Sequence, residues 1–152
     1  MKYVITDPCY ILDNEAWDRC CEIARSKDDW YDIFNNAVKD ELEKLSGKEA
    51  YACETGFGDW DNSIYGSSYS KIEKLEFCAD SGMVCVCALT NNVEESLKQK
   101  FPAGYNGCVA VIDCEGEVEV KMDKRDKGWT VVNIKDNNDI FYSQDPFNED
   151  EE

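Results

Sequence analysis

Histidine is absent from the 152-residue sequence. Its absence removes the side chain that most often serves as a general base, the usual serine and cysteine triads, and the most common zinc ligand. The sequence also lacks the Gly-x-x-x-x-Gly-Lys loop that cradles phosphates and the glycine fingerprint of dinucleotide-binding proteins. We therefore expect a protein that works by binding rather than by catalysis, and we expect it to use no cofactor.

Long apolar runs are also missing. No stretch approaches the roughly 18 apolar residues of a membrane-spanning helix. The first seven residues carry a single positive charge, and their apolar run ends after a few positions, which is unlike a signal peptide. The sequence predicts a cytoplasmic protein that makes no contact with membranes.

Basic residues are few: 16 lysines and arginines stand against 33 aspartates and glutamates, a net charge of −17. Residues 145–152 contribute five acids and no base, and removing those five charges from −17 still leaves −12. Such a charge repels nucleic acids and anionic membranes and attracts basic surfaces. We expect a basic protein as the partner and no direct contact with nucleic acid. The alternative is that the charge only maintains solubility.

The sequence contains nine cysteines, an odd number that argues against a disulfide framework. Several lie in apolar segments such as 83–88 and 107–111, where a reduced cysteine packs as a small hydrophobic residue. Neither Cys20-Cys21 nor Cys85-x-Cys87 has the spacing of a zinc-ligand pair. We predict that all nine are free thiols and that none binds a metal.

Apolar residues recur at helical spacing in two N-terminal segments. The first helix is expected to begin after a cap at Asp13 or Asn14. The second is expected to begin at Asp28 or Asp29 and to stop at Gly47, where a left-handed residue commonly ends a helix. These two helices form a predicted N-terminal pair.

After residue 48 the pattern changes to short strands, with one more helix expected to extend to Lys100. The run 83–89 is apolar on both faces, which predicts a central strand. Residues 108–113 and 118–122 flank a turn and are expected to pair as a hairpin. We expect strands at 129–134 and, at the sheet edge, 140–142 to follow.

The expected fold class is therefore α+β, with the helical pair packed on a mostly antiparallel sheet and a C-terminal β-meander. The remaining strands are expected at 2–6, with a continuation at 10–12, at 49–54 and at 75–80. Residues 1–144 are expected to form a single domain, followed by an acidic disordered tail at 145–152.

A glycine-rich segment at 54–62 carries the oxygen ligands Glu54, Asp59, Asp61 and Asn62. Such oxygens suit calcium or magnesium, but the glycine and distal glutamate of an EF-hand are missing, and an Asx turn is the alternative. Trp60 lies between two aspartates, so it is either an exposed anchor for a partner or a lid folded onto the sheet.

Two further acidic residues, Asp7 and Asp80, are expected at strand ends, where their side chains can converge. Together with the carboxylates of the 54–62 segment they form the only group that suggests a carboxylate-metal hydrolase.

The segment Asp7-Pro8-Cys9-Tyr10, the dipeptide Gly58-Asp59 and the later Asp80-Ser81-Gly82 resemble a set of small uncharacterised phage and bacterial proteins. Those proteins combine an Asp-Pro-Cys-Tyr opening with a Gly-Asp-Gly-x-Tyr segment and a later Asp-Ser-Gly. In this chain Trp60 replaces the second glycine of the middle segment. The resemblance covers roughly the first 90 residues and implies a phage or prophage origin, without implying an activity.

These observations lead to one main hypothesis. The protein is expected to be a phage-type inhibitor that mimics the charge of nucleic acid and occupies the basic groove of a nucleic-acid-handling host protein. The binding residues are expected in the 54–62 loop, at Asp59, Trp60 and Asp61, and along the second helix. The helix residues that would stand in for phosphates are Asp28, Asp29, Asp32, Asp40, Glu41 and Glu43. The alternatives are a small-molecule or nucleotide-binding protein and the carboxylate-metal hydrolase.

Overall fold

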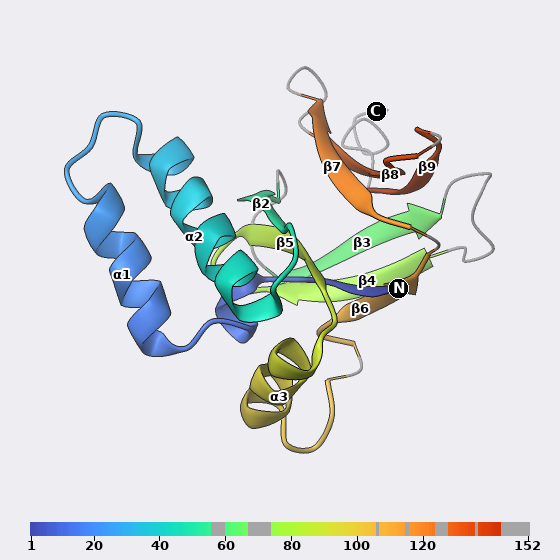
Figure 1. The fold of residues 1–152 in the computed structure, drawn as a ribbon, viewed down its shortest axis with the longest axis horizontal. Coiled ribbons are helices and arrows are strands. Elements are labelled where there is room, and N and C mark those ends of the chain that lie inside the picture. Colours follow the sequence, from blue (N-terminus) through green and yellow to red (C-terminus); the bar gives the residue numbers. More distant parts are fainter. Residues whose placement is uncertain are drawn as a thin grey trace, which may run out of the picture.

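A computed structural model describes residues 1–55, 60–66, 74–105, 107–114, 116–123, 128–135 and 137–143. Within these ranges it contains three α-helices, one 3-10 turn and nine strands (Figure 1). Residues 56–59 of the glycine-rich segment and residues 145–152 of the acidic tail lie outside the described residues, so the disordered tail stays a prediction.

The N-terminal helical pair is confirmed. Helix α1 (Asn14–Ala24) is capped by Asp13, whose side chain accepts a hydrogen bond from the Ala16 N–H at 2.8 Å. Helix α2 (Trp30–Ser46) ends at Gly47, which has the left-handed φ of 76° that a side-chain-bearing residue rarely adopts. Helix α3 (Asn91–Lys100) is the third helix that the sequence predicts.

A four-stranded antiparallel sheet has the order β2-β5-β1-β6. Its strands are β1 (Lys2–Thr6), β2 (Tyr51–Glu54), β5 (Met83–Ala88) and β6 (Ala110–Asp113). All six residues of β5 are buried, since helices cover one face of the sheet and strands cover the other. The predicted central position of this strand is confirmed.

A five-stranded antiparallel sheet has the order β4-β3-β9-β8-β7. Its strands are β3 (Trp60–Gly66), β4 (Lys74–Ala79), β7 (Val118–Asp123), β8 (Gly128–Asn133) and β9 (Asp139–Ser143). Strands β7, β8 and β9 pair in sequence order and form a C-terminal meander, as predicted, except that the expected meander began with residues 108–113. Strand β9 is not at the edge as expected, because it also pairs with β3.

The four-stranded sheet separates two hydrophobic cores. Helical residues such as Leu42 and Leu97 pack with Val4 and Cys87 on one face. On the other face, side chains such as Ile5 and Val86 pack against the five-stranded sheet, which contributes Phe77, Trp129 and Phe141. Figure 1 shows α1 and α2 on the opposite side of β5 from β7, β8 and β9. The α+β class is confirmed, with two antiparallel sheets in place of one.

Two local predictions differ from the structure. The strands expected to pair as a hairpin lie in different sheets: β6 pairs with β1, and β7 pairs with β8. The turn between them therefore carries the chain from one sheet to the other. Residues 10–12 do not continue β1, because Pro8 opens a 3-10 turn, η1 (Pro8–Tyr10). Proline has no N–H to offer a sheet ladder, so the strand ends before it.

Candidate functional site

A cluster of aromatic rings joins α1 to the first turn of α2. Trp30 and Phe34 lie four residues apart on α2, which places them on one helix face, and their rings stack with centroids 5.0 Å apart and planes at 4°. Trp17 of α1 meets Phe34 edge-on at 5.2 Å, and Tyr31 meets Trp30 edge-on at 4.9 Å. Such contacts fix the orientation of large apolar surfaces.

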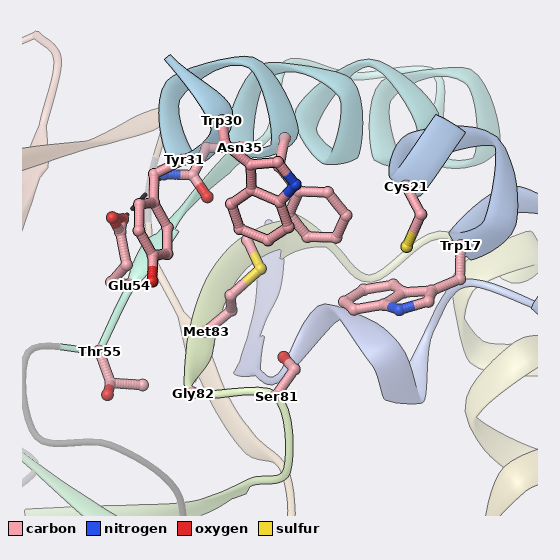
Figure 2. Close-up of a pocket in the computed structure, with 11 residues that line it drawn as sticks. Trp17, Cys21, Trp30, Tyr31, Asn35, Glu54, Thr55, Ser81, Gly82 and Met83 are labelled. Atoms are coloured by element: carbon pink, nitrogen blue, oxygen red, sulfur yellow. Dashed lines mark hydrogen bonds between the residues drawn. The ribbon is translucent and has the colours of Figure 1, made fainter. Parts of the chain in front are cut away.

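These rings line a pocket of about 560 Å³ between α1, the start of α2, the end of β2 and the start of β5 (Figure 2). We call it the aromatic pocket. Its lining residues are Trp17, Cys21, Trp30, Tyr31, Phe34, Asn35, Glu54, Thr55, Ser81, Gly82 and Met83. Among the residues that the structure describes, this lining includes no lysine or arginine.

The acidic side chain among the described lining residues of the aromatic pocket is Glu54, at the end of β2. The Asn35 side-chain amide donates a hydrogen bond to Glu54 Oε2 at 2.8 Å, which holds the carboxylate beside Tyr31 in Figure 2. The outer rings are well exposed, at 38% for Trp30 and 63% for Tyr31. An open pocket of stacked rings with a positioned carboxylate suits an organic cation.

The pocket floor is tied to a buried carboxylate. Asp7 is fully buried and accepts hydrogen bonds from the Cys9 N–H at 2.9 Å, the Asp80 N–H at 2.7 Å and the Ser81 N–H at 2.6 Å. The Ser81 hydroxyl also donates to it at 2.7 Å and 2.9 Å. The Asp-Pro-Cys-Tyr and Asp-Ser-Gly segments therefore meet in space. Both Asp7 oxygens accept from protein donors, which gives this carboxylate a structural role beside the pocket.

Four of the cysteine thiols lie in surroundings that disfavour the thiolate. Burial raises the pKa of Cys20 and of Cys87 to about 11 and that of Cys53 to about 12. Burial and the neighbouring Asp7 carboxylate also raise the pKa of Cys9. These thiols stay protonated at neutral pH, and a thiol is a far weaker nucleophile than a thiolate.

In the part of the chain that the structure describes, no three cysteine, aspartate or glutamate side chains form a group able to hold a metal ion. Asp59 lies outside the described residues, so the proposed cation site of the 54–62 segment stays untested.

The acidic residues expected along the second helix divide into two groups. Asp28, Asp29, Asp32 and Asp40 are exposed. Glu41 is buried against α1, where Arg19 donates to both of its oxygens at 2.9 Å and 3.2 Å. Glu43 pairs with Lys39 at 2.6 Å. Both glutamates are thus engaged within the protein, and their expected role toward a partner stays a prediction.

The predicted site residues do not all come together. Trp60 and Asp61 form the start of strand β3, opposite Ala79 and Cys78 of β4, rather than lying in a loop. They belong to the five-stranded sheet, whereas Asp28 and the other exposed acids belong to the helical layer.

The aromatic pocket itself was missed by sequence reasoning. Trp17 on α1, and Trp30 with Phe34 on α2, occupy positions that match the buried apolar stripe of each helix, and Phe34 is indeed buried. The available signal was the adjacent pair Trp30-Tyr31 at the start of α2, because neighbouring helix positions point about 100° apart and two such large rings extend beyond a narrow buried stripe.

Across the described ranges, every helix is too short or too polar to cross a lipid bilayer. Known protein families, curated proteins and solved structures were compared with the chain, and none matches it.

Proposed function

We propose that the protein is an acidic binding protein that docks a basic protein through its helical layer. The observation that carries the proposal is the aromatic pocket, which joins exposed rings to a carboxylate and whose described lining residues include no basic side chain. Exposed tryptophan and tyrosine side chains are the residues most often found at the energetic centre of a protein interface.

The charge around the pocket supports a basic partner. Asp29 and Asp32 flank Trp30 and Tyr31 in the sequence, and both acids are exposed. Residues 13–47, which span α1 and α2, contain ten acidic and five basic residues. A negative field of this kind steers a positively charged partner to the surface and speeds association at low salt.

A phage-type inhibitor of a nucleic-acid-handling host protein is the specific form of this function that we propose. Asp28, Asp32 and Asp40 are exposed carboxylates that can take the place of phosphates in a basic groove. Asp32 and Asp40 are eight residues apart on α2, which corresponds to about 12 Å along the helix axis. The groove would thus meet carboxylates along the helix and aromatic rings at its start.

Capture of a partner from a bacterial lysate, followed by affinity measurement at matched salt, tests this function. The triple change Asp28→Lys, Asp32→Lys and Asp40→Lys should weaken binding by more than tenfold, which is about 1.4 kcal/mol. Deletion of residues 145–152 removes five negative charges at the C-terminal end of the sequence and serves as the control, with little expected effect. Binding should also weaken as salt is raised, since the Debye length is about 8 Å at physiological ionic strength.

An unrelated basic protein such as a histone provides the decisive comparison. Equal affinity for the captured partner and for the histone would show that the surface is only charged, and the proposal would then fail.

A small organic ligand is the second candidate. It is favoured by the size of the aromatic pocket, because about 560 Å³ lies within the range of roughly 300–1,000 Å³ typical of small-molecule sites. Native mass spectrometry of protein purified from cells would then show a stoichiometric bound molecule. The molecule should be lost in Tyr31→Ala and retained in Tyr142→Ala, a change at an exposed tyrosine of β9.

A further inference from the structure

We infer that the aromatic pocket receives an arginine side chain of the basic partner. This inference deepens the proposed function and rests on it. Three properties of the pocket point to a guanidinium group: flat aromatic surfaces, a positioned carboxylate, and the absence of lysine and arginine from the lining residues that the structure describes.

The aromatic surfaces come from both helices. Trp30 is stacked on Phe34 with nearly parallel planes, so the two rings form a rigid double layer. Trp17 lies across the pocket from Trp30 in Figure 2, and Tyr31 stands at the rim. A guanidinium group is planar and weakly hydrated, and it stacks on aromatic faces more readily than an ammonium group does.

The carboxylate supplies the second element. Glu54 is half-buried, and its Oε2 is held by Asn35 at 2.8 Å. A carboxylate fixed in this way can pair with the two parallel N–H groups of a guanidinium, a geometry that an ammonium group cannot reproduce. Because Glu54 and the rings line one pocket, a single arginine side chain can stack and pair at the same time.

The test uses three short capped peptides that differ at one position, which is arginine, lysine or citrulline. Citrulline has nearly the shape of arginine without its charge. Fluorescence of Trp17 and Trp30 reports binding, because both line the pocket. The arginine peptide should bind saturably. The citrulline peptide should bind at least about tenfold more weakly, since both the cation–π contact and the charge pairing are lost. The lysine peptide should lie between them.

Two variants locate the contact. Glu54→Gln keeps the shape and the Asn35 hydrogen bond but removes the charge, and Tyr31→Ala removes an exposed ring without opening the core. Each variant should lower the affinity for the arginine peptide several-fold and reduce the difference in affinity between the arginine and citrulline peptides. The matched controls are Glu119→Gln on β7 and Tyr142→Ala on β9, which lie in the five-stranded sheet and should leave the affinity unchanged.

A second readout comes from Cys21, which is half-buried and lines the pocket. Saturating arginine peptide should slow maleimide labelling of Cys21, mapped by peptide mass spectrometry. Labelling of Cys114, which has similar exposure but lies outside the pocket lining, should not change.

Equal affinity for the arginine and citrulline peptides would overturn the inference. Unchanged affinity of Glu54→Gln for the arginine peptide, or a rate of Cys21 labelling that is the same with and without the peptide, would also overturn it. These failures differ from failure of the proposed function. If the captured partner still binds Tyr31→Ala and Glu54→Gln fully but not the triple lysine variant, the arginine site is wrong and the acidic docking surface stands. If the partner binds no better than a histone while the arginine peptide still binds selectively, the docking function is wrong.

Discussion

Replacing Asp7 with asparagine removes one acceptor from the most heavily hydrogen-bonded carboxylate that the structure describes. Four donors converge on Asp7: the N–H groups of Cys9, Asp80 and Ser81, and the Ser81 hydroxyl. Asparagine has nearly the same shape but offers one acceptor oxygen and two additional donors. The change therefore preserves packing and alters only the match between donors and acceptors.

The expected loss follows from the geometry. If the amide nitrogen replaces Oδ2, the N–H groups of Asp80 and Ser81 both face a donor. If it replaces Oδ1, the Cys9 N–H loses its acceptor, while the Ser81 hydroxyl can rotate to accept. Each unsatisfied donor costs about 1–3 kcal/mol, and the remaining bonds lose the strength that a charge gives them. We expect a destabilisation of about 2–3 kcal/mol, with a fall in Tm of roughly 5–10 °C for a chain of this size.

Urea denaturation followed by circular dichroism measures the effect, and the midpoint should fall without a change in the m-value. Asp80→Asn is the matched control, because its side chain is exposed and only its backbone N–H contacts Asp7. That control should remain within about 0.5 kcal/mol of the wild type. A loss in Asp7→Asn no larger than the loss in Asp80→Asn would refute the reasoning.

Three further predictions concern pH, thiols and the tail. Arg19 holds the pKa of Glu41 below its usual value, so this pair stabilises the fold at pH values above the ordinary glutamate pKa. The stabilisation is lost as the pH falls through the lowered pKa of Glu41, and Glu41→Gln should flatten the stability–pH profile in this acidic range. The sulfur atoms of Cys78 and Cys108 lie 3.4 Å apart, so the oxidant diamide should join them in a disulfide by removing two hydrogen atoms. A mass spectrum should show the loss of these two hydrogens, and Cys108→Ser should abolish this disulfide. Deletion of residues 145–152 should leave Tm nearly unchanged, since its acids repel one another, and a large fall would show a docked segment.

Local signals predicted the helices and the central strand well. Asp13 and Gly47 act through bonds and backbone angles within a few residues of themselves, so their roles can be inferred without knowing the rest of the fold. The run 83–88 is apolar at every position and too short for a typical helix, which is the composition expected of a strand covered on both faces.

The pairing of strands was less accessible to sequence reasoning. Residues 110–113 and 118–123 have the alternation and the intervening turn of a hairpin, yet their partners are β1 and β8. Alternation identifies which face of a strand is buried, but both sheets bury one face against the same core. The pattern is therefore equally compatible with one sheet or with two.

The fold class, two of the helix ends and the acidity could be inferred from the amino-acid sequence alone, because each depends on composition or on neighbours along the chain. Which acids are exposed, and where the aromatic pocket lies, follow from the way the elements pack in three dimensions. Glu41 looks like any surface acid of α2 until α1 places Arg19 against it. Trp17, Trp30 and Glu54 come from three separate elements, and their meeting depends on how α1 and α2 pack on β2 and β5. That packing is set by long-range burial, which no local pattern specifies.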